Sequence, residues 1–122
     1  MARKKILIID DEPDIRDMVS VRLMANGYDV VTASDGEEGL KQVESQKPDL
    51  IIVDITMPGI DGYTFVKILK KDIPAARKIP IIVLTGKDRM EDLFKIEGVG
   101  DYLVKPYESS QLLEKIKKHL YE

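Results

Sequence analysis

Short apolar runs alternate along the chain with longer segments in which apolar residues recur every three or four positions. The runs at 5–9 and 51–53 are almost continuously apolar, and each stops abruptly at acidic residues. Runs of this kind are typical of strands that are buried on both faces of a parallel sheet. We therefore predict five strands, at residues 5–9, 28–33, 49–53, 80–84 and 101–104.

The segments between the runs have the 3.6-residue periodicity of amphipathic helices. Pro13 and Asp14 suit the first turn of the first helix, and Asn26 with Gly27 provides a stop. Residues 34–37 resemble a capping box that opens the second helix. The predicted apolar sets of the five helices are Ile15, Met18, Val19 and Leu23; Leu40 and Val43; Phe65, Ile68 and Leu69; Met90, Leu93 and Phe94; and Leu112, Leu113, Ile116 and Leu120.

Five strands that alternate with five helices predict an α/β fold, a doubly wound five-stranded parallel sheet with right-handed crossovers. The fourth helix is expected over about residues 88–96. The polar stretch 70–78, which contains Pro74, is expected to be a connection. We expect residues 1–122 to form one domain, because no linker, repeat or low-complexity tract divides them.

Composition narrows the class of protein. Hydrophobic residues make up 43% of the chain and charged residues 34%, the balance of an ordinary globular protein. The chain has no cysteine and a single histidine, His119, which excludes disulfides, thiolate metal sites and multi-histidine metal sites. The net charge of −3 argues against direct nucleic-acid binding, and the apolar runs are too short to cross a membrane. Since no signal peptide is recognisable, the expected location is the cytoplasm.

Polar residues that could bind a ligand or take part in a reaction follow four of the five predicted strands. Because the carboxyl ends of parallel strands lie along one edge of a sheet, these residues are expected to be neighbours. They are Asp10 and Asp11, Asp54, Thr85 and Lys105. Each alone has an ordinary explanation as a helix cap, a turn residue or a solvated lysine. Their joint occurrence at one edge favours a functional site.

Three carboxylates packed together repel one another, so a positive charge is needed among them. Mg²⁺ fits, because it prefers oxygen ligands and usually takes one or two carboxylates while keeping several waters. Lys105 is a second source of positive charge, and Thr85 offers a hydroxyl. These groups can surround a phosphoryl group on the central carboxylate, so we predict that Asp54 is a nucleophile that forms an acyl phosphate.

Four motifs follow one another in a specific order along the chain. They are residues 8–12 (IIDDE), 54–62 (DITMPGIDG), 83–86 (VLTG) and 101–106 (DYLVKP). With this ordered set the chain closely resembles the receiver domain of two-component response regulators, of the chemotaxis-regulator type, from about residue 4 to residue 119. The resemblance implies a flavodoxin-like sheet with strand order 2-1-3-4-5.

The resemblance also implies a role for each site residue. Asp54 would be the phosphoacceptor, and Lys105 would pair with the phosphoryl oxygens. The peptide bond from Lys105 to Pro106 is expected to be cis. The implied ligands of Mg²⁺, which Mn²⁺ can replace, are Asp10, Asp11, Asp54 and the backbone carbonyl of Thr56.

Thr85 and Tyr102 resemble the switch pair of this family. Thr85 would donate its hydroxyl to the phosphoryl group, and Tyr102 would turn into the space that Thr85 vacates. The movement would change an output face made by the predicted helix 88–96, the strand 101–104 and the last helix.

Several positions modify this implied mechanism. Thr56 and Lys87 stand where the family tunes the lifetime of the phosphoryl group. Gly86 replaces the usual alanine and gives the loop after the fourth strand a freer backbone. Tyr107 stands where phenylalanine is common, and the segment 85–105 is shorter than usual, so we expect the fourth-helix region to be truncated or its loop tightened.

The implied function is that of a signalling protein, not of a conventional enzyme. It would accept a phosphoryl group from a sensor histidine kinase or a histidine phosphotransfer protein, and would catalyse its own phosphorylation and slow dephosphorylation. Its output would be contact with a downstream protein target, as a monomer or as a phosphorylation-dependent dimer. No direct contact with nucleic acid or membrane is expected.

Other classes fit the residues less well. A flavodoxin-type electron carrier or a nicotinamide dehydrogenase needs a hydroxyl- or glycine-rich phosphate loop where this chain has Asp10 and Asp11. A phosphatase with an aspartyl nucleophile needs a second acid at the position of Thr56. A receiver-like scaffold that binds partners without phosphorylation stays open as the alternative, although the complete set of site residues speaks against it.

Overall fold

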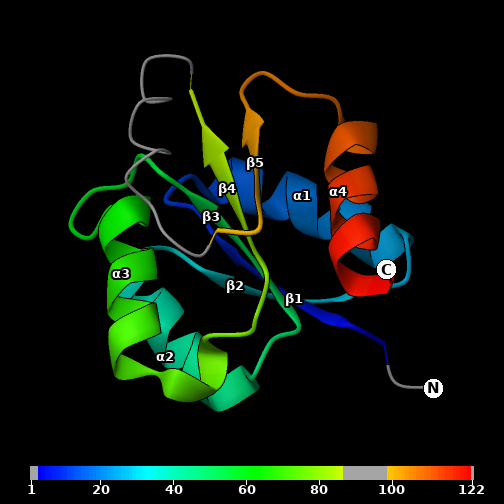
Figure 1. The fold of residues 1–122 in the computed structure, drawn as a ribbon. Helices are drawn as coiled ribbons and strands as arrows, with labels where there is room; N and C mark the ends of the chain where they lie inside the picture. Colours follow the sequence, from blue (N-terminus) through cyan, green and yellow to red (C-terminus); the bar gives the residue numbers. More distant parts are fainter. Residues whose placement is uncertain (1–2, 87–98, 122) are drawn as a thin grey trace.

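The strands form one parallel sheet in the order β2-β1-β3-β4-β5 (Figure 1). The computed structural model describes residues 3–86 and 99–121. Their strands are β1 Lys5–Ile9, β2 Asp29–Ala33, β3 Leu50–Asp54, β4 Ile81–Thr85 and β5 Asp101–Val104. The predicted α/β class and the strand order 2-1-3-4-5 are therefore confirmed.

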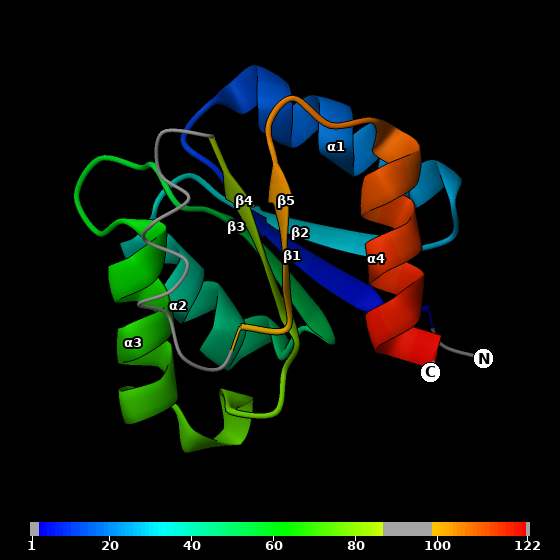
Figure 2. The same cartoon turned by 45° about the horizontal axis from the view of Figure 1, so that its top comes forward.

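Helices cover both faces of the sheet (Figures 1 and 2). They are α1 Pro13–Ala25, α2 Gly36–Gln46, α3 Gly62–Asp72 and α4 Ser109–Tyr121, with a 3-10 turn, η1, at Pro74–Ala76. On one face, α2 and α3 bury an apolar cluster that includes Val43 and Phe65. On the other, α1 and α4 bury a second cluster that includes Leu23 and Ile116. Apolar burial on two faces explains why the central strands are apolar throughout.

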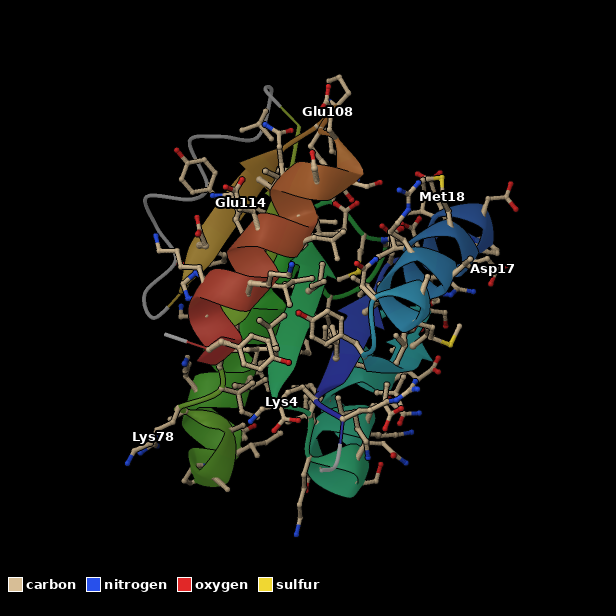
Figure 3. The ribbon with its side chains drawn as sticks, turned by 90° about the vertical axis from the view of Figure 1, so that its right-hand side faces the viewer. Lys4, Asp17, Met18, Lys78, Glu108 and Glu114 are labelled. Atoms are coloured by element: carbon tan, nitrogen blue, oxygen red, sulfur yellow. The ribbon has the colours of Figure 1, made fainter. Side chains whose placement is uncertain are left out.

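Figure 3 views the face that α1 and α4 cover, with Asp17 and Met18 of α1 and Glu114 of α4 at the surface. Within residues 3–86 and 99–121, none of the helices has both the length and the hydrophobicity that a membrane span requires. The helix that was predicted over 88–96 lies outside the described residues.

The prediction that residues 70–78 form a connection was partly wrong. The helix α3 continues through Lys70 and Lys71 to Asp72, and the 3-10 turn follows from Pro74. Basic residues in a last helical turn are favourable because they face the negative end of the helix dipole. Pro74 disfavours helical backbone at the residue directly before it, so α3 ends at the C-cap Ile73 and not four residues earlier.

The predicted cap of α2 is displaced by one residue. The N-cap is Asp35, whose carboxylate accepts a hydrogen bond from the backbone N–H of Glu38 at 2.8 Å. The Glu38 carboxylate in turn accepts from the backbone N–H of Ser34 at 3.2 Å and from its hydroxyl at 2.7 Å. Hydrogen bonds run in both directions, as in a capping box, but Glu38 and not Glu37 is the returning acid, and it bonds to Ser34, the residue before the N-cap.

The register of the ladder brings the strand ends to one edge. Ile9 pairs with Val53, Val53 with Val83, and Thr85 with Val104. The strands β1, β3, β4 and β5 therefore end at nearly the same level, and the arrowheads of β4 and β5 point to the upper edge in Figure 1. This edge carries the candidate site.

Candidate functional site

Asp54 lies at the centre of the edge, as the last residue of β3. Its side chain is buried, and the whole residue is only 3% exposed. One carboxylate oxygen, Oδ1, accepts a hydrogen bond from the backbone N–H of Thr56 at 2.8 Å. The other, Oδ2, forms an ion pair with the ammonium group of Lys105. The carboxylate is therefore held in one orientation by groups from two different elements.

Asp10 is the first residue after β1 and is buried to 1% exposure. Its Oδ1 accepts from the backbone N–H of Glu12 at 3.0 Å, while its buried Oδ2 has no hydrogen-bond partner among the described residues. Burial of the carboxyl group, reinforced by repulsion from Asp54, raises the pKa of Asp10 to about 6. The N–H of Glu12 and the charge of Lys105 act in the opposite direction. A buried carboxylate oxygen without a partner is costly and calls for a cation or a proton.

Lys105 follows β5 directly, and its peptide bond to Pro106 is cis, the isomer expected from the sequence. Its backbone N–H donates to the carbonyl of Thr85 at 2.7 Å, which anchors the start of the loop to the end of β4. Burial opposes the charge of the ammonium group. The hydrogen bond to Asp54 and the attraction of Asp54 and Asp10 outweigh burial and raise the pKa of Lys105. The side chain thus carries a full positive charge at neutral pH.

The other predicted site residues are placed less centrally. Thr85 is fully buried, and its hydroxyl donates to the carbonyl of Gly86 at 3.0 Å. Asp11 and Thr56 are exposed. Tyr102, on β5, is 45% exposed, with its ring at the surface. Lys87 lies outside the described residues.

A metal ion fits the residues present, because the charges of Asp54 and, more weakly, of Asp11 both act on the buried carboxyl group of Asp10. Among residues 3–86 and 99–121, no three His, Cys, Asp or Glu side chains form a group able to hold a metal ion. Asp10 and Asp54 are close enough to repel, and Asp10 keeps one buried oxygen unpaired. Neighbouring carboxylates with an unpaired oxygen suit Mg²⁺, which retains waters in its remaining positions.

Comparison with known proteins places this geometry in a family. A family profile described as "Response regulator receiver domain" matches residues 6–117. The chain belongs to this family of receiver domains. As a receiver domain it is a signalling module of two-component systems, and the resemblance seen in the sequence is confirmed.

Curated relatives of this receiver domain are longer proteins. The chain is 41% identical over 116 residues to the alkaline phosphatase synthesis transcriptional regulatory protein PhoP of Bacillus subtilis. This match covers 93% of the chain and 47% of that protein. It is 36% identical to the CAI-1 autoinducer sensor kinase/phosphatase CqsS of Vibrio cholerae, over 93% of the chain and 17% of that protein. The chain thus spans about half the length of the first curated relatives it matches.

Solved structures share the whole receiver fold. The chemotaxis protein CheY4 of Vibrio cholerae superposes with a TM-score of 0.86 and 32% identity, covering 98% of this chain and 100% of that one. The response regulator TrrA of Thermotoga maritima, solved in complex with Mg²⁺-BeF, gives a TM-score of 0.83 and 40% identity, covering 96% and 99%. These likenesses extend over β1 to α4 and include the edge that carries Asp54.

One residue of the receiver site was not predicted from the sequence. Arg16, in α1, donates from Nη1 to the backbone carbonyl of Asp10 at 2.6 Å. The amide of Glu12 was also missed as a partner of the Asp10 carboxylate. Neither contact could be predicted from the sequence. The Glu12 contact is made by a backbone N–H, and Arg16 is one of several charged residues on its helix.

Proposed function

We propose that this receiver domain accepts a phosphoryl group on Asp54 from a histidine kinase or a histidine phosphotransfer protein, in a Mg²⁺-dependent reaction. The observation that carries the proposal is the ion pair of buried Asp54 with half-buried Lys105, next to the unpaired carboxylate oxygen of Asp10. A purely structural ion pair does not require a second buried acid beside it. A phosphoryl acceptor does, because the cation that neutralises charge on the transferred group needs acidic ligands from the protein.

The chemistry follows from the fixed carboxylate. An oxygen of Asp54 attacks phosphorus, the new O–P bond forms, and the P–N bond to the donor imidazole breaks, with the released imidazole taking up a proton. Lys105 then transfers its hydrogen bond from the carboxylate to a phosphoryl oxygen. Thr85 donates its hydroxyl to another phosphoryl oxygen once it leaves the carbonyl of Gly86. The two new hydrogen bonds stabilise the negative charge of the phosphoryl group, and both come from residues that already lie at the site.

Asp10 and Asp54 would hold Mg²⁺, with Asp11 and the backbone carbonyl of Thr56 as further ligands, and Mn²⁺ can replace it. When bound, the ion neutralises charge on the phosphoryl oxygens. Thr56 and Lys87 are proposed to tune how long the phosphoryl group survives. The protein's own contribution is a fixed nucleophile, a fixed cation and a hydroxyl, so it promotes its own phosphorylation and slow dephosphorylation without acting on another substrate.

The output would pass through the surface around β5 and α4. Tyr102 is the exposed aromatic residue on β5, and movement of Thr85 would let its ring turn inward. The new surface would bind a downstream protein target, either as a monomer or as a phosphorylation-dependent dimer. Relatives such as PhoP are described as transcriptional regulatory proteins, but this chain matches only about half of the length of PhoP, so transcriptional regulation is not part of the proposal.

The proposal is tested by intact-mass measurement after incubation with acetyl phosphate and Mg²⁺. The wild-type chain is expected to gain one phosphoryl group, and the gain is expected to disappear in EDTA and in Asp54→Asn. Asp72→Asn is the matched control, since Asp72 is an exposed carboxylate at the end of α3. Absence of any adduct, with acetyl phosphate and with a panel of histidine kinases, would favour the phosphorylation-independent scaffold.

A further inference from the structure

A guanidinium group holds the turn that carries Asp10. Arg16 donates from Nη1 to the backbone carbonyl oxygen of Asp10 at 2.6 Å, across six residues of chain. We propose that Arg16 is a positioning residue for the divalent cation: its bond fixes the turn between β1 and α1 so that Asp10 keeps one carboxylate oxygen available for metal. The inference rests on the proposed function and adds to it a residue outside the set predicted from the sequence.

The turn needs such a restraint because α1 begins without a side-chain cap. Its N-cap is Glu12, whose side chain makes no capping hydrogen bond, and Pro13 at the first helical position has no N–H. The backbone N–H of Arg16 bonds to the carbonyl of Glu12 at 3.1 Å, as in any first helical turn. The side chain of Arg16 adds a second link, from the helix back to Asp10, which no ordinary helix start provides.

Asp10 is thereby tied down at three of its four hydrogen-bonding groups. Its backbone N–H donates to the carbonyl of Ala33 at 3.2 Å, its Oδ1 accepts from Glu12, and its carbonyl accepts from Arg16. The fourth group, Oδ2, is buried and has no partner within the described part of the chain. Such an oxygen would turn toward water if the backbone allowed it, because an unpaired buried acceptor is costly. The links at the backbone prevent that turn.

Arginine suits this role better than other residues. A charge-assisted hydrogen bond to a carbonyl is stronger than a neutral one, and the planar guanidinium loses less freedom per bond than a lysine ammonium. Groups that orient a metal ligand without touching the metal typically change its affinity 10–100-fold when removed. The predicted effect of losing Arg16 is therefore on metal affinity and not on the chemistry of Asp54.

The test measures Mg²⁺ affinity by titration calorimetry on the full chain, below its melting temperature. Arg16→Met keeps the aliphatic stem and is expected to weaken Mg²⁺ binding by about tenfold. The matched control is Arg22→Met, which removes an exposed arginine from the last turn of the same helix. Arg16→Lys retains a cationic donor and is expected to lie between the wild type and Arg16→Met, and it serves if Arg16→Met does not fold.

A second readout separates positioning from general damage. The phosphorylation rate of Arg16→Met with acetyl phosphate is expected to be low at limiting Mg²⁺ and to return to the wild-type rate at saturating Mg²⁺. Equal Mg²⁺ affinity in Arg16→Met and Arg22→Met, with a phosphorylated and Mg²⁺-binding wild type, would overturn the inference and leave the proposed function intact. A wild-type chain that binds no Mg²⁺ would overturn both.

Discussion

The ammonium group of Lys105 and the carboxylate of Asp54 form an ion pair at the edge where β3 and β5 end. The two residues are 51 positions apart along the chain. The Asp54 side chain is 5% exposed, whereas that of Lys105 is 36% exposed, so solvent weakens the pair from one side only. The pair orients the proposed nucleophile before any phosphoryl donor or metal arrives.

Replacing Lys105 should destabilise the fold, because the buried carboxylate of Asp54 loses its ion-pair partner. Lys105→Met is expected to cost about 1–2 kcal/mol in urea unfolding, less than a fully buried pair because the lysine is partly solvated. In a double-mutant cycle with Asp54→Asn, the two effects should not add, since the amide removes the charge that needs a partner. Strict additivity of the two substitutions would show that the pair does not contribute to stability.

The raised pKa of Asp10 predicts how stability depends on pH in the absence of metal. Its carboxyl group binds a proton more tightly in the folded state, with a pKa near 6, than in the unfolded state, with a pKa near 3.8. The contribution of protonated Asp10 to the free energy of unfolding is therefore fully present below about pH 4 and is lost as pH rises through 6. The change in that free energy is roughly 3 kcal/mol. In EDTA, Asp10→Asn should be more stable than the wild type at pH 8, and the gap should close at pH 4.

Magnesium should reverse this dependence, because a metal ligand must be deprotonated. Added Mg²⁺ is expected to raise the melting temperature of the wild type at pH 8, to have little effect at pH 5, and to have little effect on Asp10→Asn at either pH. A rise of equal size in the wild type and in Asp10→Asn would show that the ion binds elsewhere.

A glycine at the start of α3 keeps the backbone of β3 in place. A Cβ on Gly62 would lie 2.7 Å from Cα of Ile55 and 2.8 Å from the carbonyl oxygen of Asp54, and neither backbone atom can move freely. Gly62→Ala is expected to cost about 2–3 kcal/mol and to slow phosphorylation by displacing Asp54. The control is Gly59→Ala, in the loop before α3. An added Cβ there would meet no atom, but the φ of +75° strains the backbone and should cost about 1–2 kcal/mol of stability. Phosphorylation of this variant should be unchanged. Equal rates in both variants would contradict this account.

The carboxylate of Asp101 ties the start of β5 to α4. It accepts from Lys115 at 2.9 Å and from His119 at 3.1 Å. Burial alone would raise its pKa, but hydrogen bonds from Lys115, the N–H of Tyr102 and His119 lower it below its usual value. The folded state thus prefers the charged form, so the stabilisation is present at neutral pH and is lost as pH falls below about 4.

Asp101→Asn is therefore expected to cost about 1–2 kcal/mol at pH 7, and this cost should vanish in strong acid. Chemical denaturation at pH 7 and pH 3 measures both values. Asp29→Asn, at the exposed start of β2, is the matched control and should change stability little. A cost for Asp101→Asn that is the same at both pH values would contradict the role of the charged pair.

Sequence patterns predicted the sheet and the residues at the carboxyl ends of its strands, because both depend on burial. The apolar runs specify strands covered on two faces, and parallel register then brings Asp54, Thr85 and Lys105 to one edge of the sheet. The helix boundaries were harder, since Lys70 and Lys71 fit the solvent side of a helix as well as a loop.

Adjacent aspartates show the limit of such patterns. Asp10 and Asp11 are equivalent in the sequence, yet Asp10 is buried and Asp11 is exposed. The difference arises because Asp10 still bonds to Ala33 of the neighbouring strand, while the chain turns toward α1 immediately after it. The link from Arg16 to the Asp10 carbonyl depends on the same turn, and no periodicity predicts a contact between a side chain and the backbone six residues earlier.

The central claim is that Asp54 itself becomes the acyl phosphate, and chemical trapping tests it most directly. Borohydride reduces an aspartyl phosphate to homoserine, so the phosphorylated chain can be reduced, digested and mapped by peptide mass spectrometry. The account predicts homoserine at position 54 alone, and none without Mg²⁺ or phosphoryl donor. Homoserine at position 10 or 11, or a phosphorylated chain that yields no homoserine, would contradict it.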